Sequence, residues 1–305
     1  MKYIVTGVAG FIGSHLAEAL RARGDEVVGV DCFTDYYDLR EKEENARGLD
    51  VRRLDLAEDD LDLDGVDGVF HLAGQPGVRS FGEAFPLYLR RNVLATQRVF
   101  QSAADAGVRV VYASSSSIYG EAERYPTPEE TTPRPISPYG ITKLACEQLA
   151  HAYASSFGLD AVGLRYFTVY GPRQRPDMLF RRICDALAAG GAIELYGSGE
   201  QSRSFTEVAD VVRATVEAMH GGEPGATYNV GGGEEASLLD AIAILERISG
   251  RALDLSRIDP AKGDVRRTKA DVSRIRAALG WEPQVSLADG LARMWAWASA
   301  RVATP

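Results

Sequence analysis

Short runs of β-branched and other apolar residues alternate with longer amphipathic segments through the first two thirds of this sequence. Between the first two runs, Ile12, Leu16 and Leu20 recur at the spacing of one helix face. Strands that alternate with helices form a parallel sheet covered on both faces, through right-handed crossovers. The pattern therefore predicts an α/β fold built on a doubly wound parallel sheet. The expected strands are Tyr3–Thr6, Glu26–Asp31, Asp50–Arg53, Gly68–Leu72, Arg109–Ser114 and Asp160–Arg165.

The pattern changes after about residue 169, where proline and paired glycine become frequent. Thr206–Met219 is expected to be a helix that returns to the sheet, and Ala226–Val230 its last strand. Leu238–Ile248 and Leu287–Trp297 are expected to be further helices. A chain of 305 residues usually divides into two domains. We expect a sheet domain from residues 1–168 plus 206–228, intertwined with a smaller mixed α/β domain from residues 169–205 plus 229–305.

Charge and cysteine content exclude several classes of protein. The net charge is −9, from 34 basic and 43 acidic side chains, which argues against a broad nucleic-acid surface. The 3 cysteines are far apart and the 4 histidines are scattered, so neither disulfides nor a metal site is expected. No apolar run reaches the roughly 18 residues of a membrane span, and no signal-peptide pattern is visible. We expect a cytoplasmic protein that binds neither membranes nor nucleic acids.

Three glycines, Gly7, Gly10 and Gly13, lie between the first expected strand and the first expected helix. The first permits a tight turn, the second lets a pyrophosphate approach the backbone, and the third allows the helix to pack closely on the sheet. Phe11 and Ile12 belong to the same turn, where the helix N-terminus offers N–H groups to phosphates. In this context the motif predicts a Rossmann-type dinucleotide site.

Asp31 ends the second expected strand. A carboxylate there accepts hydrogen bonds from the adenosine ribose and repels a 2′-phosphate, so NAD is favoured over NADP as the cofactor. Asp55 and Leu56 follow the third strand and are candidates for contact with the adenine edge. Asp after a strand is, alternatively, an ordinary turn residue.

Tyr139 and Lys143 open a helix expected over Tyr139–Phe157, and their spacing places both on one helix face. A nearby ammonium stabilises a phenolate and lowers the tyrosine pKa from its ordinary value of about 10, which makes the phenol a usable base. Upstream, four serines end the fifth strand, at the sheet edge where open α/β sheets bind ligands. A hydroxyl in that run can share a substrate proton with Tyr139.

Together these motifs resemble the extended short-chain dehydrogenase/reductase superfamily, in its nucleotide-sugar epimerase and dehydratase branch. The resemblance implies that the sheet domain binds NAD and that the smaller domain binds a nucleotide sugar. The motifs are Gly7-x-x-Gly10-x-x-Gly13, His71-Leu72-Ala73-Gly74, the serine run before Ile118-Tyr119-Gly120, Tyr139-x-x-x-Lys143 and Arg165-Tyr166-Phe167-Thr168-Val169-Tyr170-Gly171-Pro172. Further cofactor contacts that the resemblance implies are Leu72, Ala73, Gly74, Asn92 and Tyr166.

The same resemblance implies a reaction without net redox change. Tyr139 takes the proton of the sugar 4-hydroxyl while the C4 hydride passes to tightly held NAD. Ser115 hydrogen-bonds the same sugar oxygen, and Lys143 holds the nicotinamide ribose and tunes Tyr139. The 4-keto sugar then rotates and receives the hydride on its other face, which inverts C4.

The residues after Ser115 indicate the fate of the ketone. Similar dehydratases carry Asp-Glu where this chain has Ser116 and Ser117, and related decarboxylases carry Glu at the position of Ser117. Thr168 stands where galactose-type epimerases carry Asn. The chain therefore looks like the UDP-glucuronate 4-epimerases, with UDP-glucuronate and UDP-galacturonate as the expected pair. UDP-glucose and UDP-galactose, or both pairs, are the alternative, and a non-catalytic NAD-binding regulator is a remote one.

Oxidation of glucuronate at C4 creates a β-keto acid, so an epimerase must hold the carboxylate where it cannot leave as CO₂. The hydroxyls of Ser116, Ser117 and Thr168 are expected to hold it, because hydrogen bonds to a charged group are strong. Arg175 and Arg79 are further candidates for the same pocket. The alternative is that the serines simply end a strand and that the arginine lies in a solvated turn.

For the nucleotide, the resemblance points to Tyr196 as a face for uracil and to Arg203 as a phosphate ligand. Galactose-type epimerases have a second phosphate arginine where this chain has Ala261. Arg267 is the candidate substitute, with Arg266 as the alternative. The nucleotide is expected to be UDP, with dTDP or another diphosphate as the alternative.

The resemblance also implies a homodimer. In this superfamily the helices around Asn92–Ala106 and Tyr139–Phe157 often pair with their copies, and both segments are suitably amphipathic.

Overall fold

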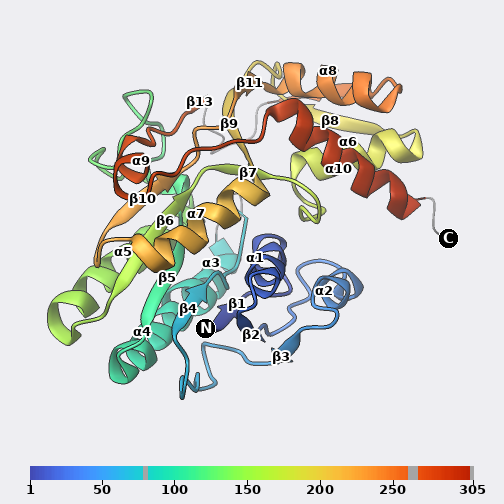
Figure 1. Ribbon diagram of the computed structural model, residues 1–305. Helices are drawn as coiled ribbons and strands as arrows, with labels where there is room; N and C mark the ends of the chain where they lie inside the picture. The colour runs from blue at the N-terminus through green and yellow to red at the C-terminus, as the bar shows by residue number, and fades with distance from the viewer. Residues whose placement is uncertain (78–81, 260–266, 303–305) are drawn as a thin grey trace.

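The computed structural model describes residues 1–77, 82–259 and 267–302. Its centre is a seven-stranded parallel sheet in the order β10-β6-β5-β4-β1-β2-β3 (Figure 1). The order reverses between β1 and β4, which is where open α/β sheets bind their ligands. The prediction of a Rossmann-type doubly wound sheet is confirmed. The strands are β1 (Lys2–Thr6), β2 (Glu26–Val30), β3 (Asp50–Arg52), β4 (Gly68–His71), β5 (Arg109–Ser115), β6 (Ala161–Tyr166) and β10 (Thr227–Val230).

Helices cover both faces of this sheet. Tyr3 and Val5 of β1 point into one hydrophobic core with α1 (Phe11–Ala22) and α7 (Val208–Gly221). Ile4 points into the opposite core with α4 (Ala95–Ala106) and α5 (Pro138–Phe157). Successive strand residues alternate between faces, so a strand buried on both sides is apolar throughout.

Local sequence signals set the ends of α5, the helix that carries the expected catalytic pair. The Ser137 hydroxyl accepts a hydrogen bond from the Gly140 backbone N–H at 3.1 Å, and Pro138 occupies the first turn. Both features favour a helix N-terminus. Gly158 ends the helix with φ of 70°, a left-handed conformation that glycine adopts without a Cβ clash.

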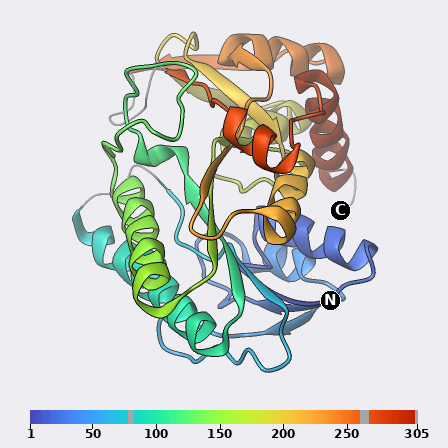
Figure 2. The same cartoon turned by 60° about the vertical axis from the view of Figure 1, so that its left-hand side comes forward.

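A second group of elements packs above the carboxyl ends of the sheet strands (Figure 1). In both views α8 (Leu238–Ser249) lies at the end of the molecule away from the N-terminus (Figure 2). The strands of this second group are β7 (Thr168–Tyr170), β9 (Ser202–Glu207), β11 (Glu235–Ser237) and β13 (Arg267–Thr268) in one sheet, and β8 (Ala192–Tyr196) and β12 (Asp254–Ile258) in another. Its helices α6 (Leu179–Ala189), α8 (Leu238–Ser249) and α10 (Leu287–Val302) share a separate hydrophobic core.

Short helices complete the connections. They are α2 (Leu39–Asn45), η1 (Gly82–Ala84), α3 (Phe85–Tyr88), η2 (Leu89–Leu94), η3 (Ser116–Ile118) and α9 (Ser273–Leu279). Within the described ranges, none of the helices combines the length and the apolar character needed to cross a bilayer.

Each strand expected from the sequence is confirmed within one residue at either end. The expected helix at Leu287–Trp297 continues to Val302. The guanidinium groups of Arg181 and Arg301 both lie near the Trp297 ring of this helix. The short strands of the second group, together with α2 and α6, were not predicted.

Candidate active site

A cavity of about 330 Å³ opens at the carboxyl ends of the sheet strands, beneath β7 and the turn before α6. It lies at the point where the strand order reverses, as the fold requires. The expected cofactor and catalytic residues that line it are Gly7, Gly10, Phe11, Ile12, Gly13, Asp31, Asp55, Leu56, Leu72, Ala73, Gly74, Ser115, Tyr139, Lys143 and Tyr166.

The glycine turn packs closely against the sheet and the start of α1. Gly7 has φ of 68°, and a Cβ there would lie 2.8 Å from the Ala73 nitrogen. A Cβ on Gly13 would collide with the Gly7 carbonyl oxygen. Gly10 begins the helix without a side-chain cap, so the N–H groups of the first turn remain available toward the cavity. This arrangement fits the pyrophosphate of a dinucleotide.

The adenosine end of the cavity carries the acidic residue expected there. Asp31 lines the wall, and its carboxylate accepts backbone hydrogen bonds from Ala9 at 3.2 Å and Phe33 at 2.8 Å. These bonds orient the carboxylate at the edge where the ribose of NAD would lie. Asp55 also lines the cavity, but it is paired with Arg90 at 2.8 Å.

Asn92 lies behind the cavity wall rather than in it. Its buried side-chain amide accepts a hydrogen bond from the Gln75 backbone N–H at 2.6 Å and donates to the Thr142 hydroxyl at 3.0 Å. Through these contacts Asn92 joins the loop after β4 to the catalytic helix α5.

The catalytic candidates meet where β5 ends beside α5. Lys143 is buried, with 6% of the residue exposed. Its ammonium donates to the Ala113 carbonyl at 2.8 Å and lies 5.8 Å from the centre of the Tyr139 ring. The Ser115 hydroxyl lines the same cavity and is hydrogen-bonded to Ser117. A phenol, an ammonium and a hydroxyl in one cavity can bind an alcohol oxygen and move its proton.

Sequence reasoning missed the buried network behind this group. Glu147, one turn after Lys143 on α5, accepts hydrogen bonds from the Ser114 hydroxyl at 2.5 Å and from Arg165 at 2.9 and 2.8 Å. Arg165 also donates to the Tyr119 hydroxyl at 2.6 Å. Burial opposes the charge on Arg165, but its hydrogen bonds to the Glu147 carboxylate raise its pKa above the ordinary value. The sequence did contain a signal for Glu147, because this residue continues the four-residue spacing of Tyr139 and Lys143 on one helix face.

The same cavity is lined by the substrate candidates Thr168, at the start of β7, and Arg175, in the turn before α6. The Arg175 guanidinium forms two bonds to the Asp177 carboxylate, at 2.9 and 3.0 Å. Ser116 and Ser117 begin η3 (Ser116–Ile118) directly after Ser115, and neither is among the described residues that line the cavity. Arg79 lies outside the described residues.

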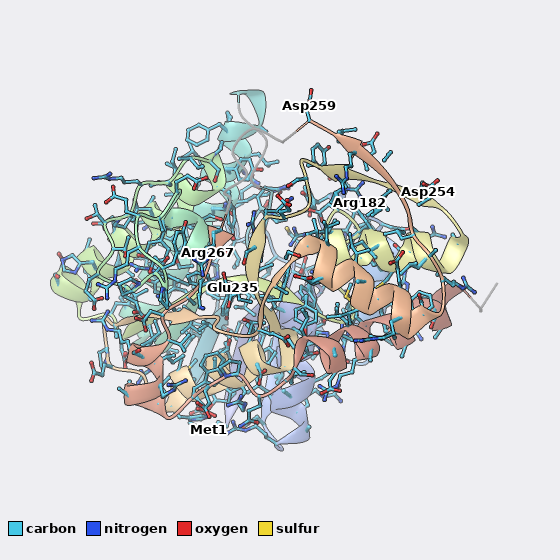
Figure 3. The ribbon with its side chains drawn as sticks, turned by 90° about the horizontal axis from the view of Figure 1, so that it is seen from above. Met1, Arg182, Glu235, Asp254, Asp259 and Arg267 are labelled. Carbon is cyan, nitrogen blue, oxygen red and sulfur yellow. The ribbon has the colours of Figure 1, made fainter. Side chains whose placement is uncertain are left out.

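The expected nucleotide contacts lie in the second group of elements. Tyr196 ends β8, and Arg203 lies in β9, where it donates to the Ser202 carbonyl at 2.9 Å. Arg267 is held by the Glu235 carboxylate at 2.7 and 3.0 Å, and Figure 3 shows the two side by side. This bond from Arg267 lowers the pKa of Glu235 to about 2. None of these three candidates is among the residues that line the cavity in the described parts of the chain.

A family model for the NAD dependent epimerase/dehydratase family matches residues 3–231. The chain belongs to this family.

Three members illustrate how similar the chain is to known epimerases. A Bacillus subtilis protein described as an uncharacterised UDP-glucose epimerase, YtcB, is 41% identical over 98% of both chains. A UDP-glucuronate 4-epimerase of Thermodesulfobacterium geofontis is 35% identical over 98% of this chain and 97% of its own. The crystal structure of UDP-glucuronic acid 4-epimerase from Bacillus cereus, with UDP-glucuronic acid and NAD, superposes with a TM-score of 0.94, 38% identity, and coverage of 99% and 100%.

Membership of the NAD-dependent epimerase/dehydratase family confirms the recognition made from the motifs and the expected cofactor. The glycine turn, Asp31 and the cavity between them are consistent with NAD at this edge of the sheet. Across residues 1–77, 82–259 and 267–302, no three His, Cys, Asp or Glu side chains group as a metal site would require.

Proposed function

We propose that the protein is an NAD-dependent UDP-sugar 4-epimerase that interconverts UDP-glucuronate and UDP-galacturonate. The observation that carries the proposal is one cavity lined by two sets of groups, which we call its first and second wall. The first wall is Tyr139, Lys143 and Ser115, from α5 and β5, and the second wall is Thr168 and Arg175, from β7 and the turn before α6. The first wall suits oxidation of an alcohol, and the second suits a carboxylate on the same sugar.

The proton chemistry follows from the first wall. Tyr139 accepts the proton of the sugar 4-hydroxyl, and Ser115 hydrogen-bonds the same oxygen as its charge develops. The Lys143 ammonium, held by the Ala113 carbonyl at 2.8 Å, stabilises the phenolate. When bound, NAD would accept a hydride from C4 of the sugar and return it to the opposite face. Tyr139 then gives its proton back to the new 4-hydroxyl.

The second wall has to prevent the sugar carboxylate from leaving as CO₂. The 4-keto form of glucuronate is a β-keto acid, and it loses CO₂ when its carboxylate stands perpendicular to the ketone plane. Hydrogen bonds from Thr168, Ser116 and Ser117, with the charge of Arg175, hold the carboxylate away from that orientation. Each bond to a charged group contributes roughly 1.5–3 kcal/mol.

The nucleotide occupies the second group of elements in this proposal. Tyr196 stacks on uracil, and Arg203 binds the diphosphate. Arg267 contributes to the diphosphate only if it leaves Glu235, with which it forms two bonds.

We also propose a homodimer in which α4 and α5 pair with their copies. These two helices pack against each other on one face of the sheet. Leu94, before α4, and Ile141, on α5, are 44% and 45% exposed. A partner molecule would remove these apolar side chains from water.

We place the enzyme in the cytoplasm, since its three cysteines are free thiols.

The decisive experiment is proton NMR of the purified protein with UDP-glucuronate and, separately, with UDP-glucose, without added NAD. A galacturonate signal that grows to a fixed ratio supports the acid-sugar epimerase and shows that NAD copurifies. Galactose from UDP-glucose alone would select the second candidate, which the Bacillus subtilis relative favours by its description. A pentose with CO₂ would contradict the proposed role of the second wall.

A further inference from the structure

Arg175 already has a carboxylate partner within the protein. Its Nε lies 2.9 Å from Oδ1 of Asp177, and its Nη2 lies 3.0 Å from Oδ2. This two-point geometry is the one with which arginine binds carboxylates most strongly. Asp177 therefore makes the same kind of contact that a sugar carboxylate would make with Arg175.

The main chain on either side of this pair is held firmly. Arg173 is ion-paired with Glu18 of α1. The buried Gln174 side chain donates to the Val169 carbonyl at 3.1 Å and accepts from the Arg181 backbone N–H at 3.1 Å. Because the turn is anchored, a change of partner at Arg175 requires only its side chain to move.

The pair itself is more open to water than the buried Gln174 beside it. The Arg175 side chain is 22% exposed and lines the cavity, while Asp177 is 41% exposed. The Tyr36 hydroxyl, from the loop after β2, reaches Oδ2 of Asp177 at 3.4 Å and also lines the cavity. Burial and the nearby Asp177 charge raise the pKa of Tyr36, so its hydroxyl stays protonated and able to donate.

The proposed reaction requires Arg175 both to bind the sugar carboxylate and to release it. It must hold the sugar carboxylate in the bound state, yet the 4-keto sugar has to rotate before C4 is reduced on its other face. Rotation carries the carboxylate to a new position, so an arginine with no other partner would resist it. A neutral sugar makes no such demand.

We propose that Asp177 is a specificity-determining residue that acts through Arg175, taking back the guanidinium while the acid sugar turns. This inference rests on the proposed acid-sugar epimerase function. Asp177 weakens the binding of UDP-glucuronate and, by doing so, speeds its turnover.

The test is the Asp177→Asn variant, which keeps the shape and an acceptor oxygen but removes the charge. For UDP-glucuronate we expect a KM lowered about two- to fivefold, as for a partly exposed ion pair, together with a lower kcat. Binding of UDP-xylose, which lacks the carboxylate, should not change. A purely structural role for Asp177 would not lower KM and kcat for the acid sugar alone.

Two further variants complete the design. Asp160→Asn removes the same charge from another partly exposed arginine pair, Asp160 with Arg109, and should leave KM and kcat unchanged. In an Arg175→Gln background, Asp177→Asn should have no further effect on the acid sugar, because Asp177 acts through Arg175.

The possible failures can be told apart. If the natural protein epimerises UDP-glucuronate while Asp177→Asn leaves KM and kcat unchanged or raises KM, the role of Asp177 is wrong and the proposed function stands. If the natural protein neither binds UDP-glucuronate in calorimetry nor converts it, both are wrong. If the natural protein binds UDP-glucuronate without converting it, the proposed epimerase function is wrong. Unchanged affinity for UDP-glucuronate in Asp177→Asn would then show that the proposed role of Asp177 is wrong as well.

Discussion

The Arg165 guanidinium and the Glu147 carboxylate form a two-point ion pair, with Nε–Oε1 at 2.9 Å and Nη2–Oε2 at 2.8 Å. Both side chains are almost fully buried. The pair joins β6 to α5 one turn beyond Lys143. The same carboxylate holds the Ser114 hydroxyl, next to Ser115, so one acidic residue connects both sides of the catalytic group.

Glu147→Gln should therefore destabilise the protein strongly. Removing one partner of a buried ion pair leaves the other charge uncompensated and costs about 3–5 kcal/mol of unfolding free energy. Chemical denaturation measures this change. Glu123→Gln, which breaks the exposed pair with Arg134, is the matched control and should cost less than about 1 kcal/mol. Equal changes in unfolding free energy for the two substitutions would show that the buried pair contributes no more to stability than the exposed one.

Tyr139→Phe should remove most of the activity and leave the fold intact, because only the proton acceptor is lost. We expect the rate to fall by roughly 10²–10⁴-fold, with UDP-glucuronate binding retained. The rate is followed by NMR and the binding by calorimetry. Tyr153→Phe removes a phenol of the same helix that bonds Gln101 instead, and should remain active. A Tyr139→Phe rate within tenfold of the natural protein would rule out the phenol as the base.

Thr168→Asn should shift the preference from the acid sugar toward the neutral one. The threonine hydroxyl lines the cavity on the same wall as Arg175, where a carboxylate is expected. Loss of one hydrogen bond to a charged group corresponds to about a tenfold change in the ratio of kcat/KM values for UDP-glucuronate and UDP-glucose. An unchanged ratio would remove the argument that Thr168 selects the acid.

Glu41 ties the cofactor side of the cavity to the second group of elements. Its carboxylate, on α2, binds Arg181 of α6 at 2.9 Å and Arg301 of α10 at 2.7 Å. Lys42, the next residue, lines the cavity. Glu41→Gln should loosen α2 and increase the loss of NAD on prolonged dialysis several-fold, as measured by chromatography of the released nucleotide. The control is the exposed Glu43→Gln. Equal retention in both variants would contradict the role of this contact.

His15 makes the protein sensitive to moderate acid. Burial, and then the Arg173 charge, lower the pKa of His15 to about 4. The unfolded chain takes up this proton near pH 6.5, so the unfolded state binds more protons between pH 6.5 and about 4, and stability falls as the pH falls through that window. His15→Gln should show a shallower decrease of Tm from pH 7 to 4.5. His151→Gln, at an exposed position, should follow the natural protein. Parallel curves for all three would show that His15 does not contribute.

The order of strands and helices in the sheet was readable because each element carries its own signal. Tyr3, Ile4 and Val5 are buried on both faces of β1, so the apolar run alone marks the strand. In contrast, β9 mixes serine, arginine and threonine, and its partners β7, β11 and β13 have two or three residues each. Such strands form because a partner is present, which no local pattern records.

The sequence by itself determined the kind of chemistry, because its groups lie close together along the chain. The glycine turn of residues 7–13 and the pair Tyr139 and Lys143 depend on a turn and on one helix face. Only the tertiary structure decided which groups hold them in place. Glu147 meets Arg165, and Asp177 meets Tyr36, across segments that approach each other through packing. Charge pairing between distant segments leaves no periodicity in the sequence, because its partners are chosen by the folded geometry alone.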